Sequence, residues 1–231
     1  MPAGHVAPRD GSNLPALARP NLNLPAPTLL ITGFGHFPGM PANPSASLAR
    51  LLARGRRRAG GQVALHLLPT RWDVAAAFPA LLEHTAPDIV LMLGVAARRR
   101  QVSIELVARN ATGDFPDAAR RRPASRPLQP GAPAERTLSA RPAPLLAALR
   151  AAGVPAHLSR QAGRYVCNAL AWGAYGWARA GRRADGGPRL AVFVHVPLPR
   201  PGRLALARLA RGLDALLAAL LAQFHQSRPR M

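Results

Sequence analysis

Residues 88–93 read DIVLML, and this short stretch points to the fold class. Five consecutive apolar residues leave no polar side to face water, which is typical of a β-strand covered on both faces. Other segments rich in Leu, Val, Ile and Ala are also predicted strands: 28–32, 62–68, 102–108, 154–159 and 190–196. The sequence therefore favours a sheet that lies inside the protein.

Segments with helical features separate these strands. Asn43, Pro44 and Ser45 form a typical helix start, with Asn as the cap and Pro in the first turn. Further helices are predicted at 72–84 (where Pro79 favours a kink or break), 145–152, 165–180 and from Arg203 onward. The alternation predicts one α/β domain over 28–225, in three layers, with a mostly parallel central sheet and helices on both faces. The remaining segments are a predicted disordered tail at 1–27 and a long loop at 110–142.

The charge of the chain is strongly positive. The sequence holds 31 arginines, no lysine and 10 acidic residues, which gives a formal net charge of +21. A GC-rich coding sequence also enriches arginine, so a solvated basic surface is favoured over a face that binds nucleic acid or anionic lipid. No arginine cluster is interleaved with aromatic residues, which weakens a single-strand-binding function.

Three other features exclude classes of protein. The single cysteine rules out an internal disulfide and a Cys-based zinc site, and it fits a reducing compartment. The longest apolar run, Ile89–Ala97, is far below the ~18–20 residues that a membrane-spanning helix needs. The first residues lack the pattern of a signal peptide. We therefore expect a cytoplasmic protein without a membrane partner.

Three residues far apart in the chain could form a catalytic group. Cys167 stands where a turn enters a predicted helix, whose first N–H groups favour a thiolate, although a lone cysteine is more often a buried hydrophobe. His195 ends a predicted strand, where sites of α/β proteins form, although a histidine at a strand end is more often structural. Glu105 lies among apolar residues, either buried beside an imidazole or facing water from an edge strand. Together they offer a nucleophile, a base and an orienting acid.

The glycine-rich segment TGFGHFPG at 32–39 follows the first predicted strand. It lacks the G-K-[ST] ending of a phosphate loop and the GxGxxG spacing of a dinucleotide site. Phe34 and Phe37 suggest the wall of an apolar pocket instead.

Four segments resemble, in the same order, motifs of the pyroglutamyl peptidase I family, the pyrrolidone-carboxylate peptidases. TGFGHFPGMPANPS (32–45) is similar to TGFxPFxGxxxNPS, and GVAARRRQVSIELVARN (94–110) to GQAGGRxxIxxERVAxN. QAGRYVCN (161–168) is similar to SAGxYVCN, and FVHVP (193–197) to FIHVP. The resemblance implies a cysteine exopeptidase of α/β fold, without a cofactor, that removes pyroglutamate from the N-terminus of peptides. Similar proteins are often oligomeric, so a homo-oligomer is possible.

The resemblance also implies the roles of individual residues. Cys167 takes the place of the nucleophile, His195 that of the base and Glu105 that of the acid. The positions that correspond to the family's pocket for the lactam ring are Phe34, Phe37, Val95, Phe115, Tyr165 and Val166. Backbone N–H groups at the start of the helix that holds Cys167 are candidates for the oxyanion hole.

Several positions depart from the family pattern. Val95 replaces a glutamine, Arg98 replaces a glycine, and Asp114 stands where the family has an arginine near its site. Arg99 or Arg109 could compensate for that reversal of charge. These departures leave open a divergent relative that has weak activity or that acts on peptides with another blocked N-terminus. A less favoured alternative is an arginine-rich protein that binds nucleic acid.

Overall fold

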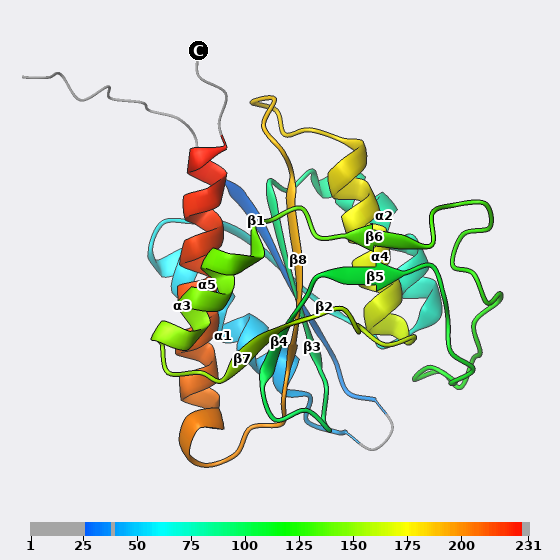
Figure 1. The fold of residues 1–231 in the computed structure, drawn as a ribbon, viewed down its shortest axis with the longest axis horizontal. Helices are drawn as coiled ribbons and strands as arrows, with labels where there is room; N and C mark the ends of the chain where they lie inside the picture. Colours follow the sequence, from blue (N-terminus) through cyan, green and yellow to red (C-terminus); the bar gives the residue numbers. More distant parts are fainter. Residues whose placement is uncertain (1–25, 38–39, 228–231) are drawn as a thin grey trace, which may run out of the picture.

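The computed structural model describes residues 26–37 and 40–227. A six-stranded sheet runs through the middle of the molecule in the order β2-β1-β3-β8-β4-β7 (Figure 1). Its strands are β1 (Thr28–Phe34), β2 (Gln62–Leu68), β3 (Ile89–Val95), β4 (Val102–Glu105), β7 (Ala156–Ser159) and β8 (Leu190–Val196). All neighbouring strands are parallel except β4 and β8, which are antiparallel. The predicted α/β class and mostly parallel sheet are confirmed.

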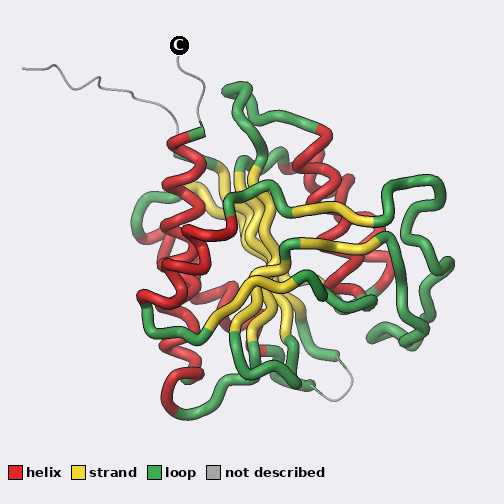
Figure 2. Tube along the Cα trace, viewed as in Figure 1, coloured by secondary structure: helices red, strands yellow, loops and turns green. Residues whose placement is uncertain are grey.

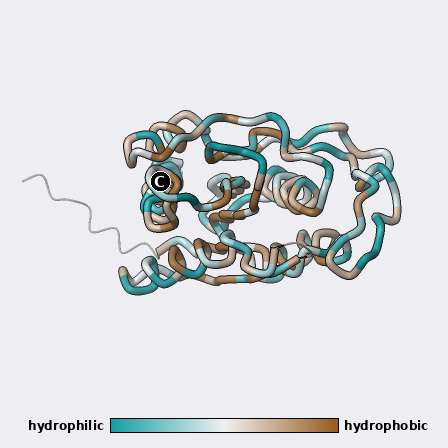
Figure 3. Tube along the Cα trace, turned by 90° about the horizontal axis from the view of Figure 1, so that it is seen from below, coloured by the Kyte–Doolittle hydropathy of each residue, from teal (hydrophilic) through white to brown (hydrophobic). Residues whose placement is uncertain are grey.

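Helices cover both faces of this sheet (Figure 2). One face packs against α1 (Pro44–Arg58), α3 (Pro142–Ala151) and α5 (Leu206–Gln226), and the other against α2 (Trp72–Thr85) and α4 (Val166–Ala180). A 3-10 turn, η1 (Gly202–Leu204), precedes α5. Figure 3 shows the same molecule from below, with hydrophobic and hydrophilic residues interspersed along the chain. No helix in the described part of the chain is long and apolar enough to cross a membrane.

The alternation of side chains along each strand assigns residues to the two faces. In β8, Val192 and Val194 pack with α1, α3 and α5, whereas Ala191 and Phe193 pack with α2 and α4. His195 is two residues beyond Phe193 and therefore lies on the α4 side. Glu105 is the register partner of Phe193 and lies on that side too.

The prediction of one strand over 102–108 is wrong, because the chain changes sheet at Leu106. The Leu106 N–H donates to the carbonyl of Ser159 in β7 (2.7 Å), while its own carbonyl accepts from Leu138 (3.1 Å). The next residues form β5 (Val107–Arg109), which pairs antiparallel with β6 (Glu135–Thr137). The predicted loop 110–142 thus contains a strand and the first residue of α3.

Pro79 does not break the predicted helix over 72–84, because α2 continues through that residue to Thr85. Pro79 packs on Gly173 of α4, where an added Cβ would lie 3.1 Å from the proline ring. Most of the predicted tail, residues 1–25, lies outside the described residues.

Candidate active site

The start of α4 presents Cys167 to the sheet. Tyr165 is the N-cap residue, in extended backbone, and Cys167 is the second residue of the helix. The buried Asn168 side chain fixes this end, since it accepts from the Arg109 N–H (2.8 Å) and donates to the carbonyls of Arg109 and Ala111 (2.8 and 3.0 Å). The first turn of α4 is therefore tied to β5 and the segment that follows it.

Glu105 and His195 form a buried pair beneath this helix. His195 Nδ1 lies 2.7 Å from Glu105 Oε1, Glu105 is fully buried, and His195 is 5% exposed. The reading of Glu105 as a water-facing edge residue is therefore wrong. Burial acts to raise the pKa of Glu105, but the hydrogen bond and charge of His195, with smaller contributions from Ser159 and Arg99, hold that pKa below its ordinary value. Glu105 is thus a carboxylate that orients the imidazole and leaves Nε2 available.

Gly94 places the Cys167 sulfur beside this pair. Gly94 is the register partner of His195 in the β3–β8 ladder. A Cβ added to Gly94 would lie 3.1 Å from Cys167 Sγ and 2.8 Å from the Phe193 ring. The sulfur therefore rests against the bare backbone of β3, next to the position of His195. Burial raises the pKa of the Cys167 thiol to about 12, and the negative charge of Glu105 adds to this effect while Arg99 opposes it.

Arg99 also belongs to this site, although the sequence offered it only as a residue that could compensate for the charge of Asp114. Its guanidinium donates to Glu105 Oε1 (2.5 Å) and also to the backbone carbonyl of Gln161. The role of compensating Asp114 belongs instead to Arg122, which lies 2.7 Å from the Asp114 carboxylate at the surface. Arg109 pairs with Glu135 (2.9 Å).

Three of the predicted pocket residues lie on the Cys167 side of the sheet. Phe34, at the end of β1, and Val166 are buried in the cluster formed with α2 and α4. Tyr165 is half-buried against Trp72, with ring centroids 5.4 Å apart, and its hydroxyl donates to the Pro116 carbonyl (3.0 Å). Tyr165 and Val166 thus belong to the start of α4, and Phe34 shares the apolar cluster on the same side of the sheet.

The other three predicted pocket residues are placed differently. The Val95 side chain packs against the core on the opposite face of the sheet, so only the backbone of Val95 could contact a substrate. Phe115 is 68% exposed. Phe37 is half-buried in the turn after β1, where its backbone pairs with Met40.

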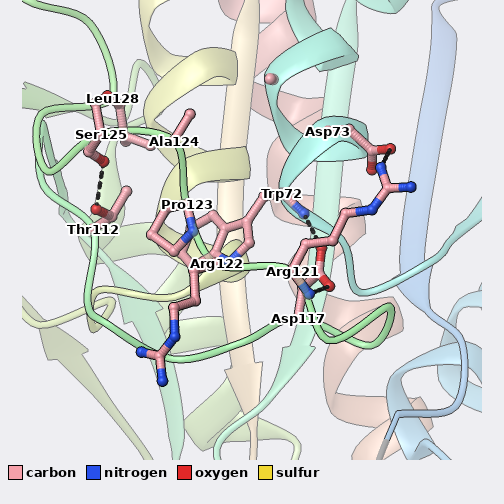
Figure 4. Close-up of a pocket in the computed structure, with 11 residues that line it drawn as sticks. Trp72, Asp73, Thr112, Asp117, Arg121, Arg122, Pro123, Ala124, Ser125 and Leu128 are labelled. Atoms are coloured by element: carbon pink, nitrogen blue, oxygen red, sulfur yellow. Dashed lines mark hydrogen bonds and ion pairs between the residues drawn. The ribbon is translucent and has the colours of Figure 1, made fainter.

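A cavity of about 290 Å³ opens beside this region, between the start of α2 and the segment 112–128 (Figure 4). Trp72 forms part of its wall and is the same side chain that packs on Tyr165. None of the predicted site residues lines this cavity. The sequence did not predict the cavity because no motif marks its lining residues. Within the described ranges, no group of three or more His, Cys, Asp or Glu residues is placed to hold a metal ion.

Fold and site together define an α/β enzyme of the cysteine peptidase class, with a buried acid–imidazole pair beside a thiol. The chain belongs to the pyroglutamyl peptidase family, whose model matches residues 28–206. The known activity of this family is removal of N-terminal pyroglutamate by a cysteine peptidase. The resemblance inferred from the motifs is confirmed.

Relatives cover most of the chain. It is 37% identical over 202 residues to a pyrrolidone-carboxylate peptidase of Gloeobacter violaceus, covering 83% of this chain and 96% of the relative. A pyrrolidone-carboxylate peptidase of Deinococcus radiodurans is 39% identical over 174 residues, covering 74% and 78%. The structure of a mutant pyrrolidone carboxyl peptidase from Pyrococcus furiosus superposes with a TM-score of 0.74 at 25% identity, covering 85% of this chain and 99% of that one.

Proposed function

We propose that this chain hydrolyses the peptide bond that follows an N-terminal pyroglutamyl residue, with Cys167 as nucleophile, His195 as base and Glu105 as orienting acid. The observation that carries the proposal is the 2.7 Å contact between Glu105 and His195, on the sheet face where the Cys167 sulfur lies against Gly94. Membership of the pyroglutamyl peptidase family supports the choice of substrate.

The mechanism follows from the state of the thiol. Because burial raises the pKa of Cys167, the thiol keeps its proton until it attacks the substrate. His195 Nε2 takes that proton while sulfur bonds to the carbonyl carbon of the pyroglutamyl residue. The imidazolium, stabilised by Glu105, then gives the proton to the leaving amine, and the C–N bond breaks to leave a thioester. Water, deprotonated by His195, attacks the thioester and releases pyroglutamate and the free thiol.

Selectivity for a lactam follows from charge and shape. The side of the sheet that holds Cys167 is apolar: Phe34 and Val166 are buried there in the cluster formed with α2 and α4, and Tyr165 is half-buried against that cluster. An uncharged ring can enter such surroundings, whereas a free N-terminal ammonium would lose its hydration without gaining a partner, at a cost of several kcal/mol. The first N–H groups of α4 are suited to bind the developing oxyanion.

Replacement of the nucleophile tests the proposal. Cys167→Ala should lower kcat/KM for a pyroglutamyl-linked fluorophore by at least about a thousandfold, because no thioester can form. Circular dichroism should show an unchanged fold. The matched control is the wild-type chain with an alanyl-linked fluorophore, which should not be cleaved. Retention of full activity by Cys167→Ala would reject the nucleophile.

The alternative of a changed specificity rests on Val95, Arg98 and Asp114. Arg98 and Asp114 are both exposed, and Asp114 is paired with Arg122. These two substitutions therefore give no reason to expect a substrate other than the family's. A panel of pyroglutamyl, acetyl and formyl peptides separates the two possibilities. Cleavage of an acetylated or formylated peptide in preference to the pyroglutamyl one would favour the alternative.

A further inference from the structure

The segment between β3 and β4 contains three consecutive arginines with different surroundings. Arg98 and Arg100 are exposed, whereas the side chain of Arg99 is 25% exposed and faces inward. Its guanidinium donates to two acceptors that come from different parts of the fold, the Glu105 carboxylate and the Gln161 carbonyl. Arg99 is therefore held by specific partners, unlike its two neighbours in the chain.

The two acceptors flank the proposed catalytic group. Glu105 holds His195, and Gln161 lies six residues before Cys167, in the segment that leads into α4. Gln161 is itself fixed, since its N–H donates to Ser159 Oγ at the end of β7 (3.1 Å). One guanidinium thus connects the acid to the segment that carries the nucleophile.

We propose that Arg99 is a positioning residue of the peptidase, which holds the Glu105 carboxylate against His195 and fixes the segment leading to Cys167. The catalytic part of this proposal rests on the proposed peptidase function. The two hydrogen bonds of the Arg99 guanidinium go to Glu105 and to the backbone of Gln161, so Arg99 acts on the sulfur through these two residues. The planar fork of arginine suits two acceptors at once, which lysine cannot match.

The charge of Arg99 has a second consequence. Charged and titratable groups around His195 come from several elements: Glu105 from β4, Cys167 and Tyr175 from α4, His157 from β7, and Arg99 itself. Among them Arg99 is the cation that lowers the pKa of both Glu105 and Cys167. Without it both pKa values rise, so ionisation of each group needs a higher pH.

The experiment compares Arg99→Gln, Arg99→Lys and, as matched control, Arg100→Gln. Cys167 is the only cysteine of the chain, so the rate of alkylation by iodoacetamide reports on this thiol alone. For Arg99→Gln we expect the pH profile of alkylation and the acid limb of kcat/KM to move upward, and kcat to fall about ten- to a hundredfold with a smaller change in KM. Arg99→Lys keeps the charge, so it should shift the pH profiles less but still lose kcat. Arg100→Gln should match the wild type.

Chemical rescue gives a readout that a general loss of stability would not produce. Millimolar guanidinium should restore part of the activity of Arg99→Ala and leave the activity of Arg100→Ala, which is expected to match the wild type, unchanged. Wild-type behaviour of Arg99→Gln in both pH profiles would overturn the proposal, and so would equal effects at positions 99 and 100. If the wild type fails to cleave pyroglutamyl amides while only the Arg99 variants shift the alkylation profile, the proposed function fails and the positioning role stands.

Discussion

The two faces of the central sheet differ in what they bury. The face under α1, α3 and α5 packs the strands against a continuous cluster of Leu, Ile, Val, Ala and Phe side chains. The face under α2 and α4 buries similar apolar residues but also Glu105, His195 and Tyr175, beside the half-buried Cys167. The first face also buries polar residues, such as Ser45 of α1 and Gln223 of α5, but these are uncharged, whereas the second face buries an ionisable acid–imidazole pair. Buried charged groups cost more free energy than neutral ones unless they are paired. The comparison suggests that the first face serves stability and the second serves chemistry.

The largest effect we expect is on the apolar face. Leu213 of α5 is fully buried, and Leu213→Ala should lower the free energy of unfolding by about 2–5 kcal/mol because it leaves a cavity. Urea unfolding measures this change. The value of kcat/KM per folded molecule should stay within twofold of the wild type, since Glu105, Cys167 and His195 lie on the opposite side of the sheet from α5.

Leu51→Ala in α1 is the control for this prediction. Leu51 is 44% exposed, so the same truncation should cost well under about 2 kcal/mol. A large loss of catalysis in folded Leu213→Ala would show that the two faces are coupled, and the proposed division of roles would then be wrong.

The second prediction concerns the polar face. In Gly94→Ala the new methyl group would lie 3.1 Å from Cys167 Sγ and closer still to the Phe193 ring, so sulfur and ring must shift. A displacement near 1 Å in a reacting group can cost about a hundredfold in rate, and we expect a loss of kcat/KM of that size. The free energy of unfolding should fall by about 1–3 kcal/mol through overpacking.

Gly55→Ala offers a matched glycine control. Gly55 lies within α1, and an added Cβ meets no atom within 4 Å. That variant should keep full activity and become more stable, by up to about 1 kcal/mol, because alanine favours the helix. If Gly94→Ala alkylates and cleaves at the wild-type rate, the sulfur does not depend on the bare backbone of β3.

Much of the fold and the central part of the site could be predicted from sequence. The apolar run at 88–93 and the helix start at Asn43 depend on local patterns, and both are confirmed. Glu105, Cys167 and His195 were selected by residue type and by a family resemblance, and the structure brings all three to one side of the sheet. The assignment of their catalytic roles stays a prediction.

The remaining features depend on tertiary contacts that leave no local pattern. Nothing in VSIELVA marks the change of sheet at Leu106, which is set by its two hydrogen-bond partners in β7 and after β6. Arg98, Arg99 and Arg100 are the same residue type, and only the folded chain distinguishes the one that reaches Glu105. The side of the sheet taken by Val95 follows from strand register, which the sequence did not reveal.

A third, smaller effect should separate polar groups that support the site from those that react. The buried Tyr175 hydroxyl donates to the Glu105 carbonyl (2.6 Å) and accepts from the Phe193 N–H (3.2 Å), and so links the helix of Cys167 to the strands of Glu105 and His195. Tyr175→Phe leaves both backbone groups without this partner, which should lower the free energy of unfolding by about 1–3 kcal/mol. Because the bond between His195 and Glu105 remains, kcat/KM should fall only about threefold to tenfold. A variant with wild-type stability would show that the hydroxyl does not hold these strands, whereas a loss as large as that of Cys167→Ala would place Tyr175 among the groups that react.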